Sequence, residues 1–422
     1  MAYSVIAKIV GVLLVVNIHF LCGMVSIPTH EQQLHAIAHG KLTLASEVRI
    51  GKGGHGSAIG AMAMLSDGEH VAVQDLDLRL TMWHIPSQRT ISTLSGGREF
   101  CVMADCDDKP VIVTLGGDNA ITIFDAHTLE LLHKIENAYS TRWSMGRIIY
   151  YPFGSFGQHL LLTTGKKTKM VSVWDVKHHV VAEYFYRLGA DAPIDCRLVL
   201  IDNEPHLLVG TLESGINTFS YEEMVKEFYV HVLNLKTGSY RQMLRTPFIR
   251  TKAHTSIVGE RPFELIVSHN NHYFIVLSKS GTMVKWGLQA LTESPIASVT
   301  IPDYVRGSSL YYYQGTDYII LANTVGDLDV WDMDTMRHCR TIKTGLNKPR
   351  LKSWLERYVI AFTMEKDGLF KIYDFETGRC LHTHEHEAKI MDIIPGPHGS
   401  LITGDHKGGL QLWNFVLDEA NS

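Results

Sequence analysis

The sequence predicts an all-β protein in which one small sheet is repeated along nearly the whole chain, and two observations lead to this prediction. The first is a short phrase that recurs eight times. Each copy is an alternating run that ends in an aromatic or aliphatic anchor, often followed by Asp or Asn and then by a polar turn. The anchors are Trp83, Phe124, Trp174, Leu233, Trp286, Trp331, Tyr373 and Trp413. They follow one another at intervals of 40 to 59 residues, as expected for supersecondary units that cannot bury their apolar faces alone.

The second observation is that each unit divides into short runs of alternating polarity separated by turn residues. The expected strands of the first unit are residues 58–65, 70–74, 78–85 and 89–94. The last unit shows three, at residues 390–395, 401–404 and 410–415. Four short strands for each unit predict a repeated four-stranded antiparallel sheet.

Two of the phrases, VSVWD at residues 171–175 and LDVWD at 328–332, resemble the repeats of the WD-repeat family of β-propellers. The resemblance covers residues 41 to about 415. It implies a single propeller of four-stranded blades, with eight blades expected and seven as the alternative. We assign residues 41–418 to this domain.

The family's typical repeat has a Gly-His pair before the first strand, hydrogen-bonded to an Asp six residues before the Trp. Gly54, His55 and Asp77 supply most of this pattern in the first unit. Asp118 and Asp367 supply only the Asp in two others. Because Val325 and Lys407 occupy the equivalent positions of two further units, we expect packing rather than this polar contact to hold those blades.

The segment at residues 41–50 predicts how the ring closes. Leu42, Leu44, Val48 and Ile50 alternate with other residues before the first full unit begins, whereas the last unit lacks a fourth strand. We expect residues 41–48 to supply that strand, which would leave no open edge between the last and first blades.

The N-terminus has a different character. Residues 1–28 form a hydrophobic leader with an apolar stretch from Ile9 to Val25, typical of a signal peptide or an N-terminal membrane anchor. An apolar extension packed on the domain is the alternative. Residues 29–40 are expected to be a polar linker. Six cysteines without paired spacing and no Asn-x-Ser/Thr acceptor favour the cytoplasm or the cytoplasmic face of a membrane, with the secretory pathway as the alternative.

Composition and motifs argue against several classes of function. A formal net charge of −5 disfavours nucleic-acid binding through bulk charge. The sequence carries no nucleophile elbow, paired Cys-x-x-Cys, His-Glu-x-x-His or phosphate-binding loop, so no catalytic residue, metal ligand or cofactor is expected. The segment 51–56, GKGGHG, matches the dinucleotide fingerprint, but a strand rather than a helix is expected after it, so we interpret it as a loop.

Two further features of the sequence are candidate sites. His382, His384 and His386 alternate and would share one face of a strand, a candidate metal edge. Glu385 and Glu387 interleave with them, and a solvated outer strand is the favoured interpretation. A second feature is an insertion between the second and third strands of the fourth unit, where a capping box at 220–223 predicts a short helix through Phe228.

Basic residues recur in the loops that join the fourth strand of one unit to the first strand of the next. They are Lys52, Arg98, Arg142, Arg187, Arg250, Lys252, Arg261, Arg306, Lys348, Arg350 and Lys389. In a propeller these loops share one face, so the predicted function is a non-enzymatic scaffold that binds a partner protein, in particular an acidic or phosphorylated peptide. Exposed loops are rich in Lys and Arg without any function, which is the simpler alternative. The competing functional class is a secreted or periplasmic propeller enzyme or small-ligand-binding protein.

Overall fold

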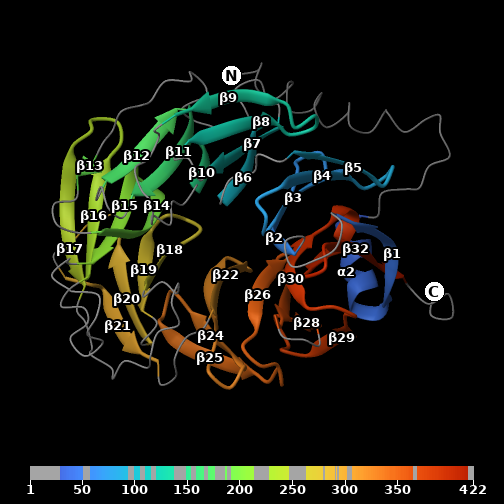
Figure 1. The fold of residues 1–422 in the computed structure, drawn as a ribbon. Coiled ribbons are helices and arrows are strands. Elements are labelled where there is room, and N and C mark those ends of the chain that lie inside the picture. Colours follow the sequence, from blue (N-terminus) through green and yellow to red (C-terminus); the bar gives the residue numbers. More distant parts are fainter. Residues whose placement is uncertain are drawn as a thin grey trace, which may run out of the picture.

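The computed structural model describes eight four-stranded antiparallel sheets that follow one another in chain order around a ring (Figure 1). The described residues are 29–50, 58–93, 99–104, 110–115, 120–136, 149–153, 158–165, 170–175, 186–187, 192–212, 228–246, 263–278, 281–289, 291, 294–301, 307–364 and 368–416. The predicted all-β class is confirmed, and the repeated sheets have a propeller-like arrangement.

Each of the first four sheets consists of four consecutive strands. The first sheet contains β2 (Ile59–Met64), β3 (His70–Asp75), β4 (Leu80–His84) and β5 (Arg89–Thr93). The second contains β6 (Glu99–Ala104), β7 (Pro110–Leu115), β8 (Ile121–Asp125) and β9 (Leu131–Ile135). The third contains β10 (Ile149–Phe153), β11 (Gln158–Gly165), β12 (Met170–Asp175) and β13 (Tyr186–Arg187). The fourth contains β14 (Ala192–Ile201), β15 (Glu204–Leu212), β16 (Phe228–Asn234) and β17 (Tyr240–Thr246).

The remaining sheets follow the same order. The fifth contains β18 (Phe263–Val267), β19 (Tyr273–Ser278), β20 (Thr282–Gly287) and β21 (Ala297–Thr300). The sixth contains β22 (Gly307–Tyr313), β23 (Thr316–Ala322), β24 (Leu328–Asp332) and β25 (Arg337–Ile342). The seventh contains β26 (Arg350–Trp354), β27 (Tyr358–Phe362), β28 (Leu369–Asp374) and β29 (Cys380–Glu385). The eighth contains β30 (Ile390–Pro395), β31 (Leu401–Asp405), β32 (Gly409–Val416) and β1 (Lys41–Arg49), with a short 3-10 helix, η2 (Pro397–Gly399), between β30 and β31.

The repeat anchors lie on the third strand of every sheet, counted from the inner strand. The structure describes seven of their side chains, and all seven are buried: Trp83, Phe124, Leu233, Trp286, Trp331, Tyr373 and Trp413. Trp174 lies on β12, where only the backbone is described. A buried large side chain at this position in the seven described units explains why the phrase recurs, since a fully buried aromatic residue stabilises by about 3–5 kcal/mol relative to Ala.

The core lies between the sheets rather than within any one of them. Leu65, Ala72 and Met82 of the first sheet pack with Ile112 and Phe124 of the second. Corresponding clusters join the fourth and fifth, fifth and sixth, sixth and seventh, seventh and eighth, and eighth and first sheets. Among the described side chains, the first, fifth, sixth, seventh and eighth sheets therefore each bury both faces against their two neighbours, which is why one unit would not be stable alone.

Buried polar groups connect neighbouring sheets as well. The Asp195 carboxylate accepts a hydrogen bond of 2.9 Å from the backbone N–H of Leu265, and Asp317 accepts one of 2.9 Å from the N–H of His269. The Lys285 ammonium lies 3.7 Å from the ring centroid of Tyr273 and donates to the carbonyl oxygen of Met333 at 2.9 Å. Burial lowers the pKa of Lys285 against the opposing effect of nearby carboxylates. These contacts fix the orientation of one sheet relative to the next.

The segment after residue 40 pairs with the last strand of the chain, as predicted. β1 runs antiparallel to β32, from Lys41 opposite Val416 to Arg49 opposite Gly409, with a bulge between Leu44 and Ser46. The eighth sheet therefore takes its outer strand from the N-terminal side of the chain and its other three strands from the C-terminal side. It packs in turn against the first sheet through Ile59, Trp83 and other residues.

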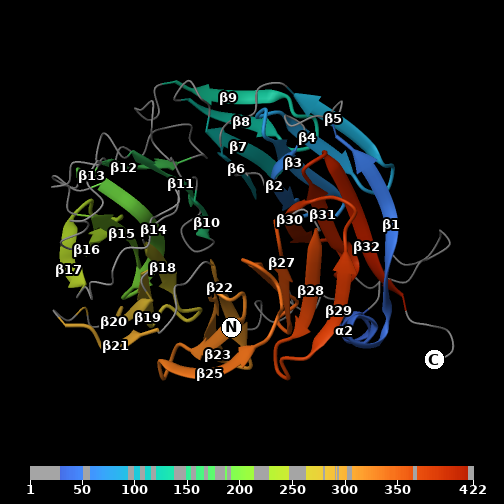
Figure 2. The same ribbon diagram turned by 60° about the horizontal axis from the view of Figure 1, so that its bottom comes forward.

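Residues 29–40 differ from the expected linker, because they form a helix, α2 (His30–His39), which packs on the eighth sheet (Figure 2). Thr29 and Gln32 form a reciprocal capping box at its start. Ile37 is buried, and the Tyr358 hydroxyl donates a 3.0 Å hydrogen bond to the carbonyl oxygen of Leu34. The polar composition of this segment concealed one apolar side that is used for packing.

The predicted leader at residues 1–28 lies outside the described residues. Among the residues that are described, no helix is long and apolar enough to cross a membrane.

Candidate functional site

The predicted basic loops are described only in part. Lys348 and Arg350 are exposed, and Lys389 is half-buried. Arg350 begins β26, and the backbone of Arg187 lies in strand β13 rather than in a loop, so these two predicted loop positions are corrected. Outside the described residues lie Lys52, Arg98, Arg142, Arg250, Lys252, Arg261 and Arg306.

A glycine anchors the beginning of several of these loops. Gly281, Gly326, Gly368 and Gly408 occupy the turn between the second and third strands of the last four sheets, with φ of +86°, +89°, +49° and +81°. Their carbonyl oxygens accept hydrogen bonds from the first residues after the fourth strands. The donors are Ile301 N–H at 2.5 Å, the Thr344 hydroxyl at 2.5 Å, His386 N–H at 3.1 Å and Ile50 N–H at 2.8 Å. Four loops that carry predicted basic residues therefore leave their sheets from the same kind of fixed point.

The loop that leads to Lys348 is held by further polar contacts. The Thr344 hydroxyl accepts the Leu346 N–H at 2.9 Å while donating to the carbonyl oxygen of Gly326. The Asp327 carboxylate accepts the Lys343 ammonium at 2.6 Å and the Thr344 N–H at 3.3 Å. The hydrogen bond to Asp327 raises the pKa of Lys343.

The seventh sheet contacts the same loop. The Lys371 ammonium donates a 2.6 Å hydrogen bond to the carbonyl oxygen of Thr344. The loop is thus attached to two sheets at once, which restricts the positions available to the exposed side chains of Lys348 and Arg350.

The units that contain Val325 and Lys407 were expected to depend on packing, and the structure gives both a local polar contact. The Asn323 amide oxygen accepts the N–H groups of Val325 and Asp327. Asp405 accepts the N–H groups of Lys407 and Gly409 at 2.7 and 2.9 Å. In the last unit the Trp413 indole also donates to the Thr403 hydroxyl at 3.0 Å. These hydrogen bonds lie within single turns and accompany the apolar packing of both units, so the expectation stays a prediction.

His382 and His384 share one face of β29, as predicted, and His386 follows directly after the strand, but these side chains do not form a solvated face. The His382 ring is hydrogen-bonded at 2.5 Å to the carbonyl oxygen of Ile37 in α2. The centroid of the His384 ring lies 4.2 Å from that of Trp413, and burial, with a contribution from His386, lowers the pKa of His384. His386 is buried, and its Nδ1 lies 2.9 Å from the carbonyl oxygen of Ala388. These side chains are packing residues between the seventh and eighth sheets, because the neighbouring sheet covers their face.

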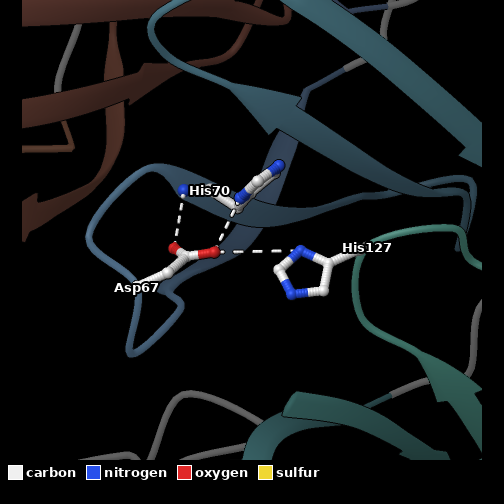
Figure 3. Close-up of side chains that lie close together, drawn as sticks. All are labelled: Asp67, His70 and His127. Atoms are coloured by element: carbon white, nitrogen blue, oxygen red, sulfur yellow. Dashed lines mark hydrogen bonds and ion pairs between the residues drawn. The ribbon is translucent and has the colours of Figure 1, made fainter. Parts of the chain in front are cut away.

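A different cluster, which the sequence did not indicate, joins the first and second sheets. It lies at the ends of the strands that are opposite to the predicted basic loops. Asp67 lies in the turn between β2 and β3, His70 begins β3, and His127 follows β8 (Figure 3). The Asp67 Oδ2 atom lies 2.7 Å from Nδ1 of His70 and 3.8 Å from Nδ1 of His127. We call these three residues the Asp67 cluster. The spacing of Asp67 and His70 is unremarkable by itself, and only the packing of two sheets brings His127 to them.

The electrostatics of the Asp67 cluster favour an ionised carboxylate. Burial alone would raise the pKa of Asp67, but hydrogen bonds from the N–H of Glu69 and from His70 outweigh this effect and lower it. The His84 ring stacks on His70 with a centroid distance of 4.5 Å, and its Nε2 lies 3.5 Å from a Glu69 carboxylate oxygen. The site thus combines ionised carboxylate oxygen and imidazole nitrogen on a partly exposed surface.

Two other predicted features fall largely outside the described residues. The glycine-rich segment 51–56 and residues 213–227 of the insertion are among them. Phe228, the expected end of the insertion helix, instead begins β16 and is fully buried.

Comparisons with known proteins bear on the fold alone. No protein-family model matches the chain, and no curated protein matches it either. Among solved structures, the chain is similar to the crystal structure of the computationally designed Ika8 protein, with a TM-score of 0.59 and 16% sequence identity. The match covers 86% of this chain and 98% of the designed one. At this identity the likeness supports the arrangement of the sheets and carries no information on function.

Proposed function

We propose that this protein is a non-enzymatic interaction scaffold, and that its partner is a protein with an acidic or phosphorylated segment. In this proposal the repeated four-stranded sheets are the blades of a WD-repeat-type propeller, and the pairing of β1 with β32 completes the ring. On this interpretation the loops that follow the fourth strands share one face, and among the described residues Lys348 and Arg350, the latter at the start of β26, are exposed there. The ligand chemistry follows from those side chains, because guanidinium and ammonium groups bind phosphate and carboxylate through charge-assisted hydrogen bonds.

The observation that carries the proposal is the repeated glycine anchor. Gly281, Gly326, Gly368 and Gly408 fix the point at which four loops leave their sheets. Loops held in place before binding lose less conformational entropy on binding than mobile ones, so the same contacts give a higher affinity. Rigid loops on a stable β framework are a common basis for protein recognition.

The distribution of described contacts agrees with a role for the loop side chains in binding. Lys343, at the start of the loop, is paired with Asp327, whereas Lys348 and Arg350 further along are exposed. Lys343 stabilises the loop through this ion pair, whereas Lys348 and Arg350 are accessible to a ligand. On this proposal Lys348 and Arg350 contact the anionic segment of the partner.

Charge reversal with a matched control tests the proposal. The variant Lys348→Glu/Arg350→Glu changes two exposed basic residues of the candidate face. The control Arg337→Glu/Arg379→Glu makes the same change of net charge at two exposed residues near the turns between third and fourth strands, at the opposite ends of the strands. Both variants are expected to fold, because all four side chains are exposed.

The readout is binding to an array of phosphoserine and polyglutamate peptides, measured against the unmodified protein. We expect the loop variant to lose affinity at least tenfold and the control to keep it. Adding charge reversal at Arg98, Arg142 and Arg306 should abolish the remaining binding. Equal binding by both double variants, or no binding of any acidic peptide by the unmodified protein, would refute the proposed ligand class.

A further inference from the structure

We propose that the Asp67 cluster is a binding site for a divalent transition-metal ion of the zinc type, with Asp67, His70 and His127 as ligands. The three side chains offer one oxygen and two nitrogen atoms, all within 4.8 Å of one another. The site is independent of the proposed peptide-binding face, because it lies at the opposite ends of the strands, between the first and second sheets.

The distances suit a metal of this size. Zinc binds imidazole nitrogen and carboxylate oxygen at about 2.0–2.1 Å, so two ligands of a tetrahedral ion are separated by about 3.3 Å. The two distances from the Asp67 oxygen, 2.7 Å to His70 and 3.8 Å to His127, lie on either side of that value. Both distances from the Asp67 oxygen are thus within about half an ångström of the ligand separation at a tetrahedral ion.

The carboxylate is held in a suitable orientation before any ion binds. Its Oδ1 atom accepts the backbone N–H groups of Glu69 at 2.9 Å and His70 at 3.1 Å. This leaves Oδ2 directed at the two imidazoles, as Figure 3 shows. To coordinate the metal through Nδ1, the imidazole of His70 must carry its proton on Nε2.

The second histidine also comes from an ordered turn. The Asp125 carboxylate accepts the N–H groups of His127 at 2.9 Å and Thr128 at 2.8 Å. The His127 backbone is therefore fixed, while its side chain remains 42% exposed and can adjust. Two fixed turns, one on each sheet, reduce the entropy lost when the ion is bound.

The donor set selects the class of ion. Two imidazoles with one carboxylate suit zinc and similar first-row divalent ions, whereas calcium and magnesium prefer sites made only of oxygen. Glu69 lies beside the site through its contact with His84, and it adds negative charge without serving as a ligand. Three protein ligands leave a coordination position open to water or to an external donor.

The ion would connect two sheets that also pack together through apolar side chains such as those of Ala72, Met82 and Phe124. Asp67 and His70 belong to the first sheet, and His127 belongs to the turn after the third strand of the second. A ligand that binds only the folded arrangement stabilises it in proportion to the logarithm of its concentration over the dissociation constant. Zinc is therefore expected to raise the temperature of unfolding.

The test uses the full-length protein with zinc chloride and, as a spectroscopic probe, cobalt chloride. Calorimetric titration counts the equivalents of zinc bound, and the visible absorption of cobalt reports a site with nitrogen and oxygen ligands. The variants are Asp67→Asn, whose amide oxygen can still accept the two backbone N–H groups, and His127→Gln at an exposed position. His398→Gln, at another exposed histidine, is the control for nonspecific binding.

We expect Asp67→Asn and His127→Gln each to weaken the tightest zinc equivalent by about tenfold or more, and to abolish the corresponding cobalt bands and the zinc-dependent rise in unfolding temperature. His398→Gln should leave all three readouts unchanged. The circular dichroism of the zinc-free variants should match that of the unmodified protein, which separates loss of the site from loss of the fold. The proposal is wrong if no saturable equivalent is found, or if the control reduces binding as much as the two site variants do.

Discussion

The glycine anchor at Gly326 makes a quantitative prediction about stability and about the loop that carries Lys348. Gly326 has φ of +89° and lies in the turn between β23 and β24. A Cβ atom at this position would overlap the carbonyl oxygen of Leu346, lie 2.9 Å from its carbonyl carbon and come within 3.6 Å of Pro349 Cδ. The substitution Gly326→Ala therefore forces the backbone of the loop away from the turn.

Gly315 is a matched control. It has φ of +85°, almost the same as Gly326, and no atom within 4 Å of an added Cβ. Gly315→Ala therefore carries only the cost of placing a side chain in the left-handed region, about 1 kcal/mol. Any additional decrease in the free energy of unfolding of Gly326→Ala measures the effect of the close approach to Leu346.

The expected magnitude follows from the contacts that would be broken. Displacing the loop would break the hydrogen bond from Thr344 to the carbonyl oxygen of Gly326 and the one from Thr344 N–H to Asp327. Each such bond contributes about 1 kcal/mol net, so Gly326→Ala should lower the free energy of unfolding by about 3 kcal/mol, against about 1 for the control. Urea titration followed by tryptophan fluorescence measures the difference.

The same pair of variants tests the link between the anchor and binding. Because the displaced loop carries Lys348 and Arg350, Gly326→Ala should also weaken binding to acidic peptides under conditions in which the variant is still folded. Equal losses of stability in the two variants would refute the steric argument. Unchanged peptide binding by folded Gly326→Ala would show that the anchor does not position the binding residues.

Two further predictions concern the closing strand and the dependence of stability on pH. Val48→Asp places a carboxylate among apolar residues between the eighth and first sheets, and it should lower the free energy of unfolding by about 2 kcal/mol in the same urea titration. Leu44 lies on the same strand, but its side chain is 47% exposed, so Leu44→Asp should have little effect. Equal losses would mean that β1 contributes only its backbone pairing. Since the pKa of His384 is lowered in the folded state, its neutral form contributes stability that is present above the ordinary pKa of 6.5 and is lost as the pH falls below it. His384 packs on Phe370 and Trp413 beside His386 and Glu385, so His384→Phe should reduce the loss of stability between pH 7.5 and pH 5.5, and an unchanged loss would assign the effect to other groups.

Much of the fold could be predicted because the residues that recur in each repeat are large side chains with one structural role, which is to be buried between two sheets. Trp83, Trp286 and Trp413 each fill the space between two sheets, and each is followed or preceded by a turn of polar residues. The alternation at 41–48 likewise predicted a strand that pairs with the chain's last strand. These features are local in sequence, so hydrophobic period and turn composition are enough to recognise them.

The helix α2 escaped prediction because its residues are polar on average. Only Ile37 of this helix is buried. The helix is held by the packing of Ile37 and by hydrogen bonds to Tyr358 and His382, which are more than 300 residues away in sequence. The solvent exposure of the face formed by His382, His384 and His386 was also predicted wrongly. Strand alternation places these side chains together, but the sequence does not show that another sheet covers them.

By itself, the sequence determined the strand pattern, the repeated anchors and the N-terminal strand, because these depend on residue period and on residue type. The tertiary structure alone decided which distant side chains meet. His127 reaches Asp67 and His70 through the packing of two sheets, and the glycine turns reach the loops after the fourth strands through antiparallel pairing within each sheet. Contacts of this kind depend on where whole sheets lie relative to one another, and that position results from the burial of many apolar residues rather than from any short motif.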